Sequence, residues 1–362
     1  MKTLAWMMAG LIQAGNISLT AWVPSVHSRA VYAPSPVRRW TRWLAHTRLD
    51  VPALYGPLMQ HAMAAWGAQR VYLALDPSML WKTSGLVRLA LVYRGRAIPM
   101  VWTVLEHPSS RVAYDVDTEL LDKVVEGLPV GCTVVCPAER GFADTHLMTH
   151  LTGLGWHGRI RVNGSVWIHR QGKRRGKVNR LPLSPGKALF WPQVYLPKPG
   201  YGPVHLALGR PIGSQDSWFV VSDEPTDEKT FAAYGLRFAS EEHCLDDTSQ
   251  GFQLESSLSR SANALDRLCG VLAITTRYRV AQGTAVVAQG QRRWGDAPWF
   301  RGQRYLTIGW KWVKLALSRG DALIPHLQRS AEADPAPAMA SKIQQQKPSQ
   351  RFLALEFEDA VA

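Results

Sequence analysis

Three apolar runs between residues 71 and 105 constrain the fold of this chain most. They are Val71–Leu75, Leu86–Tyr93 and Ala97–Leu105, and Arg94-Gly95 reads as a turn between the last two. Short apolar runs bounded by turn residues are typical of buried strands, so the sequence predicts three adjacent strands that end in a hairpin. Further elements are expected as a helix over 116–126, a strand over 133–136, a helix over 144–154 and a strand over 158–162.

The order strand–strand–strand–helix–strand–helix–strand is that of an RNase H-like fold. We therefore expect an α/β protein whose RNase H-like catalytic core is interrupted by a β insertion and preceded by a helical region. The expected segments are a helical N-terminal DNA-binding region over 1–66 with breaks at Pro24 and Pro34–Pro36, the first part of the core over 67–162, the β insertion over 163–222, the C-terminal helices of the core over 223–329, and a disordered tail over 330–362.

The charge balance favours a polyanionic partner. Lys and Arg total 42 against 28 Asp and Glu, which gives a formal net charge of +14. Basic side chains that neutralise phosphates release condensed counterions, so nucleic acid is the first candidate and an anionic membrane surface the second. Apolar residues make up 46% of the chain, which excludes wholesale disorder. No run of 18 apolar residues exists, so no membrane span is expected.

The N-terminus and the cysteines bear on localisation. Leu4–Ile12 after Lys2 imitates a short signal peptide, but Gln13 and Asn16 interrupt it, so an amphipathic helix is the preferred interpretation. The four cysteines lack zinc-finger spacing and are expected to be buried, reduced thiols. We expect a cytoplasmic protein, associated with the nucleoid of a bacterium.

Two basic segments are candidate DNA contacts. Arg38, Arg39 and Arg42 lie among Trp40 and Trp43 on an expected helix, whose apolar stripe would pack while its arginines face outward. This pattern fits either a solvated basic face or a helix that contacts phosphate. The second segment, with the same two interpretations, contains Lys173, Arg174 and Arg175 in the β insertion.

Acidic residues follow two of the expected strands. Asp76 ends the first apolar run, and Glu139 lies just past the strand over 133–136. Carboxylates at such positions can hold Mg²⁺, although each alone is more often a turn or cap residue.

A third group is more specific. Tyr234, Arg237, Glu241 and Thr248 lie within about 60° of arc if one helix carries them all, at roughly 100° per residue. Polar and charged side chains where an apolar face is expected indicate a site.

This spacing resembles the Y-x2-R-x3-E-x6-K signature of the insertion-sequence-4 family of DDE transposases. The run LALDPSML…LVYRGRAIPMVW resembles the first-Asp block of that family, and AERGFAD resembles its second-acid block. FASEEHCLDDTSQGFQLESS resembles the helix that carries the final Glu. The likeness covers roughly residues 4–320, with the three blocks in the family's order.

The resemblance implies a cut-and-paste transposase. Asp76, Glu139 and Glu241 would form a triad that holds Mg²⁺ or, in its place, Mn²⁺. The substrate would be double-stranded DNA at terminal inverted repeats and at the target, bound by a homodimer. Tyr234 and Arg237 would contact DNA phosphates.

The β insertion would hold the transposon end. Trp167 and Trp191 are candidates to stack an unpaired base, with core packing as the alternative.

Two departures from the family pattern define an alternative. Glu139 stands where the family usually has Asp, and Thr248 stands where it has the signature Lys, which exchanges a cation for a hydroxyl at that DNA contact. The alternative is a catalytically weakened or inactive transposase copy that acts as a DNA-end-binding protein. Asp144 is the fallback second acid, although an N-cap role suits it better.

Other patterns compete with this interpretation. His146 and His150 have a spacing that can bind zinc, but no third ligand is evident. Asp223 could be taken for a metal ligand and is expected to cap the following helix. A general RNase H-like nuclease is a third functional hypothesis.

Overall fold

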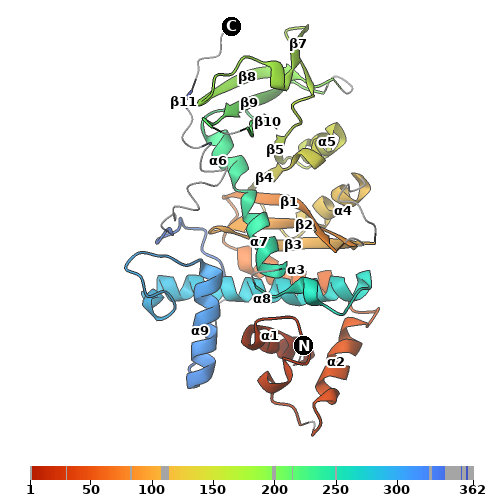
Figure 1. The fold of residues 1–362 in the computed structure, drawn as a ribbon, viewed down its shortest axis with the longest axis vertical. Helices are drawn as coiled ribbons and strands as arrows, with labels where there is room; N and C mark the ends of the chain where they lie inside the picture. The colour runs from red at the N-terminus through yellow and green to blue at the C-terminus, as the bar shows by residue number, and fades with distance from the viewer. Residues whose placement is uncertain are drawn as a thin grey trace.

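A single large mixed sheet organises the computed structural model of this chain (Figure 1). The structure describes residues 2–357 except 30, 82–83, 107–113, 198–200, 214, 249–250, 326–327, 339–351 and 353–355. The sheet order is β3-β2-β1-β4-β5-β10-β9-β8-β6-β7, and β11 pairs with β8. The first five strands in sequence are β1 (Arg70–Leu80), β2 (Ser84–Tyr93), β3 (Arg96–Leu105), β4 (Thr133–Ala138) and β5 (His157–Arg161).

The predicted strands of the first half are confirmed, with one difference at β1. Strands β1, β2 and β3 form an antiparallel meander, β4 lies parallel to β1, and β5 lies parallel to β4. β1 does not end at Asp76 but continues to Leu80, because Pro77–Leu80 keep antiparallel pairing with β2. Asp76 therefore projects from within a strand rather than from its end.

The strands expected as a β insertion extend the same sheet. β10 pairs antiparallel with β5, and β9, β8, β6 and β7 follow outward from it. The insertion is thus continuous with the first five strands through backbone hydrogen bonds. Its strands are β6 (Trp167–Arg170), β7 (Lys173–Lys177), β8 (Lys187–Tyr195), β9 (Val204–Arg210) and β10 (Trp218–Ser222).

Helices precede, separate and follow the strands along the chain. The helix α8 crosses below the sheet, with α1, α2 and α9 beneath it (Figure 1). The α-helices are α1 (Lys2–Ala14), α2 (Pro34–Leu44), α3 (Val51–Met63), α4 (Tyr114–Val125), α5 (Thr145–Gly153), α6 (Lys229–Gly235), α7 (Phe238–Thr248), α8 (Ala262–Ala288) and α9 (Tyr305–Arg319). The short 3₁₀ turns are η1 (Val23–Ser25), η2 (Arg140–Phe142), η3 (Val178–Arg180), η4 (Leu254–Ser256) and η5 (Arg292–Trp294).

Proline and glycine explain two local features of these helices. The expected break at Pro34–Pro36 is wrong, because Pro34 occupies the first position of α2, where a missing N–H is harmless. Helices α8 and α9 cross in close contact because Gly283 faces Gly309. A Cβ at Gly283 would lie 2.0 Å from the Tyr305 carbonyl, so this crossing needs glycine.

The C-terminal tail is partly ordered, contrary to expectation. Phe352 is buried and stacks on Trp218 with ring centroids 3.8 Å apart. The strand β11 (Glu356–Phe357) pairs parallel with β8. Phe352 thus covers the rings of Trp218 and Phe231, the latter on α6. Most of the remaining segment that was expected to be disordered lies outside the described residues.

Among the helices that the structure describes, none combines the length and the apolar character that crossing a bilayer requires. The four cysteines are free. Cys136 and Cys269 are buried as expected, whereas Cys132 and Cys244 are only partly buried, which differs from the expectation.

Candidate active site

Strand register brings two of the predicted acids together. Leu75 on β1 is paired with Ala138 on the parallel strand β4. Asp76 and Glu139 are the next residues along these two strands. Because parallel neighbours run in the same direction, the two acids lie side by side at the end of the β1–β4 pairing.

Arg237 joins these acids to the third one. Its Nη2 lies 2.8 Å from Oε1 of Glu139 and 2.6 Å from Oε1 of Glu241, and its Nη1 lies 3.3 Å from Oδ1 of Asp76. Glu241 lies in the first turn of α7, which packs on β1, β2 and β3. Three carboxylates from three separate elements therefore converge on one guanidinium, and we call these four residues the carboxylate cluster.

The cluster is buried on one side and open on the other. The Arg237 side chain is only 2% exposed, whereas those of Glu139 and Glu241 are 43% and 47% exposed. The two glutamates border an open pocket of about 410 Å³, whose lining also includes Asp76 and Thr248. A substrate can thus reach the carboxylates from solvent, while the guanidinium of Arg237 is buried beneath them.

Burial dominates the ionisation of Asp76. It raises the pKa of Asp76 above the ordinary value of 3.8, and the nearby Glu139 and Glu241 add to that effect. Arg88 and Arg237 act in the opposite direction but do not cancel it. Arg237 itself remains charged: burial opposes its charged form, but Tyr234, Glu139 and Glu241 raise its pKa overall.

The donor chemistry of the cluster fits a hard divalent cation. Carboxylate oxygens are the ligands that Mg²⁺ and Mn²⁺ prefer, and three of them converge here. Within the described part of the chain, no group of three His, Cys, Asp or Glu side chains is already arranged around a vacant metal position. In the cluster the Arg237 guanidinium lies among the acids, so a cation would have to share or replace its contacts.

A second group of charges, not found by sequence reasoning, lies on another face of α7. Arg88 Nη1 lies 2.6 Å from Asp247 Oδ2, and Arg96 Nε lies 2.8 Å from Asp246 Oδ2. Arg304 pairs with Glu242. We call Arg88, Arg96, Arg304, Glu242, Asp246 and Asp247 the arginine-matched network.

Arg88 links the network to the cluster. It is the cross-strand partner of Asp76 in the β1–β2 pairing, and it is buried. A signal was present in the sequence, since a charged residue interrupts the apolar run LVRLALVY. Its pairing with Asp76 could not be predicted without the strand register.

The signature residues do not share one helix. Tyr234 belongs to α6, Arg237 lies in the turn after it, and Glu241 and Thr248 belong to α7. The expectation of one continuous helix face is therefore wrong. Arg237 and Glu241 nevertheless meet, because they are four residues apart and the turn at residues 236–237 keeps a helical conformation at Leu236.

Tyr234 and Thr248, both expected as DNA contacts, are buried in this structure. The ring centroid of Tyr234 lies 4.9 Å from that of Trp218. Thr248 lines the open pocket, and its hydroxyl donates to the Cys244 carbonyl at 2.8 Å.

The two basic segments are exposed, as expected. Arg38, Arg39 and Arg42 face outward from α2, whose Trp40 is buried. Lys173, Arg174 and Arg175 lie on the exposed edge strand β7.

The two candidate stacking residues are both half-buried. The guanidinium of Arg174 lies 3.3 Å from the ring centre of Trp167, and that of Arg170 lies 5.5 Å from the ring centre of Trp191. Both rings thus already carry a cation on one face.

The competing motifs have structural roles. Asp144 caps α5, as expected, by accepting from the His146 nitrogen at 2.7 Å. His150 contacts Asp122 at 2.8 Å, and the described residues around it include no zinc-binding group.

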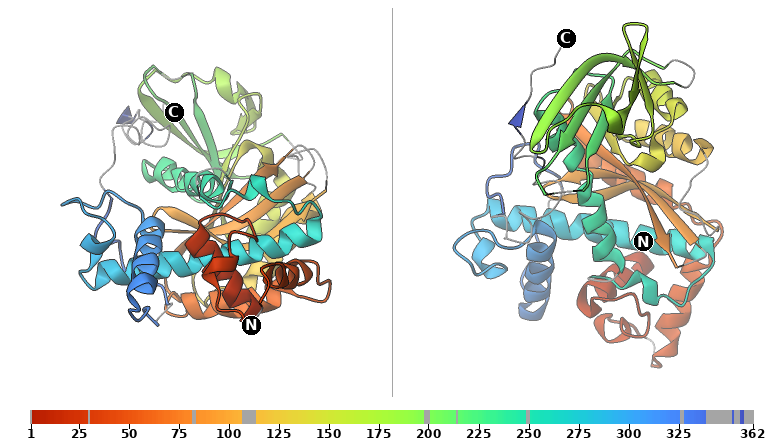
Figure 2. Two further views of the ribbon diagram at one scale, coloured as in Figure 1. Left: turned by 60° about the horizontal axis from the view of Figure 1, so that its bottom comes forward. Right: turned by 45° about the horizontal axis from the view of Figure 1, so that its top comes forward.

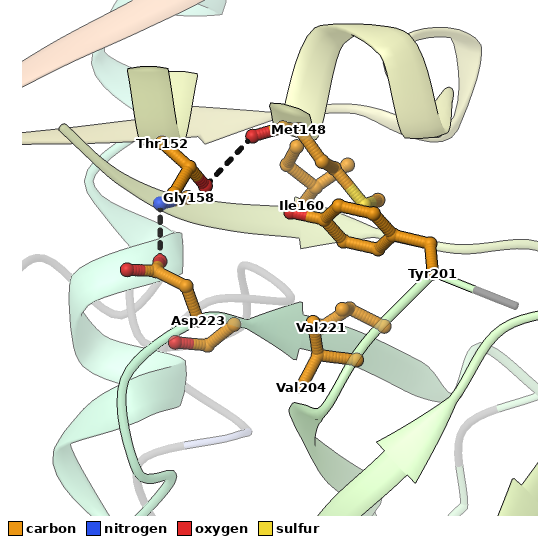
Figure 3. Close-up of a pocket in the computed structure, with 9 residues that line it drawn as sticks. Met148, Thr152, Gly158, Ile160, Tyr201, Val204, Val221 and Asp223 are labelled. Carbon is orange, nitrogen blue, oxygen red and sulfur yellow. Dashed lines mark hydrogen bonds between the residues drawn. The ribbon is translucent and has the colours of Figure 1, made fainter. Parts of the chain in front are cut away.

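Asp223 does not cap a helix, which corrects the expectation. Its carboxylate accepts from the Gly158 nitrogen at 2.8 Å (Figure 3). It also contacts His157 at 2.7 Å. The adjoining space, closed by Tyr201, measures only about 10 Å³. Asp223 therefore fixes the start of β5.

Comparison with known proteins gives similarity to solved structures only. No family model matches the chain, and no curated protein matches it. Among solved structures, it is similar to a piggyBac transposase in a synaptic complex with hairpin DNA, with a TM-score of 0.44 and 12% sequence identity, over 96% of this chain and 80% of that chain. What the site can do is therefore argued from its own residues.

Proposed function

We propose that this chain is a DDE transposase of the insertion-sequence-4 family, with an RNase H-like core. It would cleave double-stranded DNA at terminal inverted repeats and join the freed ends to target DNA, acting as a homodimer in the bacterial cytoplasm. The observation that carries this proposal is the convergence of Asp76, Glu139 and Glu241 on Arg237 beside an open pocket. The order β3-β2-β1-β4-β5, with β4 and β5 parallel to β1, supports the proposed core.

The three carboxylates would hold Mg²⁺ or Mn²⁺. When bound, such ions supply a nucleophile at neutral pH and stabilise the attacking and leaving oxygens of a phosphodiester. Asp76 must be ionised to take part, and a bound cation would offset the burial that raises its pKa. Arg237 already presents two nitrogens to carboxylate oxygens, the same fork that binds two oxygens of a phosphate.

Duplex DNA would contact the exposed basic side chains. The net charge of +14 provides long-range attraction for phosphates. Arg38, Arg39 and Arg42 on α2, and Lys173, Arg174 and Arg175 on β7, are exposed and available for backbone contacts.

One observation favours a second candidate function, a DNA-end-binding protein without catalysis. Arg237 contacts all three carboxylates and neutralises part of their charge. Thr248 offers no cation to the pocket, and its hydroxyl is already used within α7. A copy that has lost cleavage would keep the fold and the exposed basic side chains.

Cleavage of an end-labelled duplex tests the proposal. The duplex carries the inverted repeat that borders the gene, and Mg²⁺ or Mn²⁺ is added to the wild type, Asp76→Asn and Asp122→Asn. Asp122 is the matched control, because it is an acid on α4 outside the pocket. We expect the wild type and Asp122→Asn to nick at the repeat boundary and Asp76→Asn to be inactive.

Each other result has a definite meaning. Binding of the repeat without nicking by the wild type, in either metal, would support the end-binding protein instead. Equal nicking by the wild type and Asp76→Asn would show that the carboxylate cluster is not the active site.

A further inference from the structure

The loop between α8 and α9 displays large aromatic side chains to solvent. Trp299 is 89% exposed, Trp294 53% and Phe300 51%. Exposed apolar rings that gather in one segment mark an interaction surface more often than scattered single ones do. We call residues 289–304 the aromatic–arginine loop. It follows α8 and lies at one end of that helix, away from β6, β7 and β8 (Figures 1 and 2).

Hydrogen bonds fix the shape of this loop from within. Arg292 donates to the carbonyls of Pro298, Trp299 and Phe300 at distances of 3.0–3.1 Å. Oδ2 of Asp296 accepts from Arg292 and from the Gly302 nitrogen, both at 3.0 Å. The rings are therefore presented by a preorganised turn, which lowers the entropy that binding would otherwise lose.

Two further arginines of the loop anchor it to the rest of the protein. Arg301 is buried and lies 3.1 Å from Asp334. Arg304 pairs with Glu242 on α7. Three of the four arginines of the loop thus build or attach it.

The fourth arginine faces outward with the rings. The Arg293 guanidinium lies 4.1 Å from the ring centre of Trp299 and, among the described residues, has no carboxylate within ion-pair distance. Arg319, exposed at the end of α9, lies 5.5 Å from the ring centre of Trp294. The loop's own acid, Asp296, is fully buried. The exposed surface is consequently aromatic and cationic, with no acidic side chain contributed by the loop.

We infer that the aromatic–arginine loop binds an unpaired segment of nucleic acid. Unpaired bases expose faces that stack on aromatic rings, at about 1–3 kcal/mol per base, and arginines beside the rings meet the phosphates. An intact duplex keeps its base faces stacked on each other, so it offers these rings little. A purely apolar protein partner would leave Arg293 and Arg319 without anionic partners.

The loop is independent of the carboxylate pocket. None of its residues lines that pocket within the described part of the chain. The inference therefore stands or fails separately from the proposed transposase activity. Arg304 does connect the loop to the helix that carries Glu241, but binding does not require that connection.

Photocrosslinking locates the contact on the full chain. A short oligonucleotide of bromodeoxyuridine, about 12 nucleotides long to match typical single-strand sites, is irradiated with the protein at raised salt, and the crosslinked peptides are identified by mass spectrometry. We expect crosslinks in the peptide that contains Trp294, Trp299 and Phe300. Crosslinks found only elsewhere, for example at Trp167, would overturn the inference.

Affinity measurements with matched variants complete the test. Fluorescence anisotropy with a labelled oligothymidine should show about tenfold weaker binding for Trp299→Ala, the loss of roughly one stacked base. Trp299→Phe keeps a ring and should retain most of the affinity. Leu258→Ala, at a side chain that is 95% exposed outside the loop, should bind like the wild type.

Three outcomes would contradict the inference. They are an unchanged oligothymidine affinity in Trp299→Ala, an equal loss of duplex binding, or a change only in self-association measured by light scattering. Because Trp299 is exposed, Trp299→Ala should fold normally, and circular dichroism checks this.

Discussion

The acidic side chains at two faces of the helix α7 differ in how many arginines they pair with. In the carboxylate cluster, Asp76, Glu139 and Glu241 share one directly bonded guanidinium, that of Arg237. In the arginine-matched network, Glu242, Asp246 and Asp247 meet three arginines.

The difference indicates which face is built for function. A set of acids that is matched by arginines is largely neutralised, and its ion pairs to Arg88 on β2 and Arg96 on β3 hold α7 against the sheet. An unmatched set beside solvent retains negative charge and can accept a further cation. Neighbouring residues on one helix, Glu241 and Glu242, thus fall into different roles because one faces the pocket and the other faces arginines.

Replacing Asp76 should produce the largest effect and separate the two faces most clearly. We expect Asp76→Asn to reduce cleavage of the terminal-repeat duplex by about 1,000-fold or more, the equivalent of about 4 kcal/mol in the barrier. Its free energy of unfolding should stay the same or rise, because burial disfavours the ionised acid. Cleavage assays and urea denaturation measure the two quantities. A large loss of stability would assign Asp76 to a structural role instead.

Breaking the network should have the reverse pattern. Arg88→Ala leaves Asp247 buried with one partner fewer, so we expect unfolding to become easier by about 3–5 kcal/mol. Urea denaturation measures this, with Arg38→Ala on the exposed face of α2 as a control expected to change stability by less than about 0.5 kcal/mol. Similar small changes in both variants would contradict the structural role of the network.

Shortening Glu139 tests how strictly the cluster is positioned. Glu139→Asp withdraws the carboxylate by about one carbon–carbon bond, ~1.5 Å, away from Arg237. We expect cleavage to fall by about 10- to 100-fold, since displacements of this size cost reactions about that much. The stability should barely change. A faster Glu139→Asp variant would show that this chain carries an impaired second acid.

The pH dependence of stability should have opposite signs on the two faces and is the smallest effect. The pKa of Asp76 is raised, so its ionisation lowers the free energy of unfolding as the pH rises from 3.8 through the raised value. Although burial opposes its charge, His243 and Arg88 lower the pKa of Asp247 overall. Its stabilisation is present above 3.8 and is lost as the pH falls towards the lowered value.

Denaturation at several pH values, for the wild type, Asp76→Asn and Asp247→Asn, measures both contributions by difference. If the two acids contributed to the pH dependence of the free energy of unfolding with the same sign, the two faces would no longer be distinguished.

The sequence predicted the acids of the cluster but not their surroundings. Asp76 and Glu139 could be found because apolar strands immediately precede both, and parallel pairing then brings them together. Arg88 was missed because its pairing with Asp76 depends on the β1–β2 register, which apolar patterning over a fully buried strand does not define.

Long-range contacts explain the remaining differences. A helical arc through Tyr234 and Thr248 ignored the turn that separates α6 from α7 after Gly235, a residue of low helix propensity. The composition of the tail gave no sign that Phe352 would stack on Trp218, since that contact depends on an open aromatic surface formed far away in sequence. The strands within residues 163–222 were predicted from their short apolar runs, whereas their continuity with the first five strands became visible only through the β5–β10 pairing.

Metal binding by the carboxylate cluster is the most direct test of this account. Mn²⁺ bound to the protein–duplex complex can be measured by electron paramagnetic resonance, for the wild type, Asp76→Asn and Asp247→Asn. We predict bound Mn²⁺ in the wild type, a strong loss in Asp76→Asn, and retention in folded Asp247→Asn. Equal Mn²⁺ binding by the wild type and Asp76→Asn, or none by either, would contradict the claim that the unmatched face of α7 holds a catalytic cation.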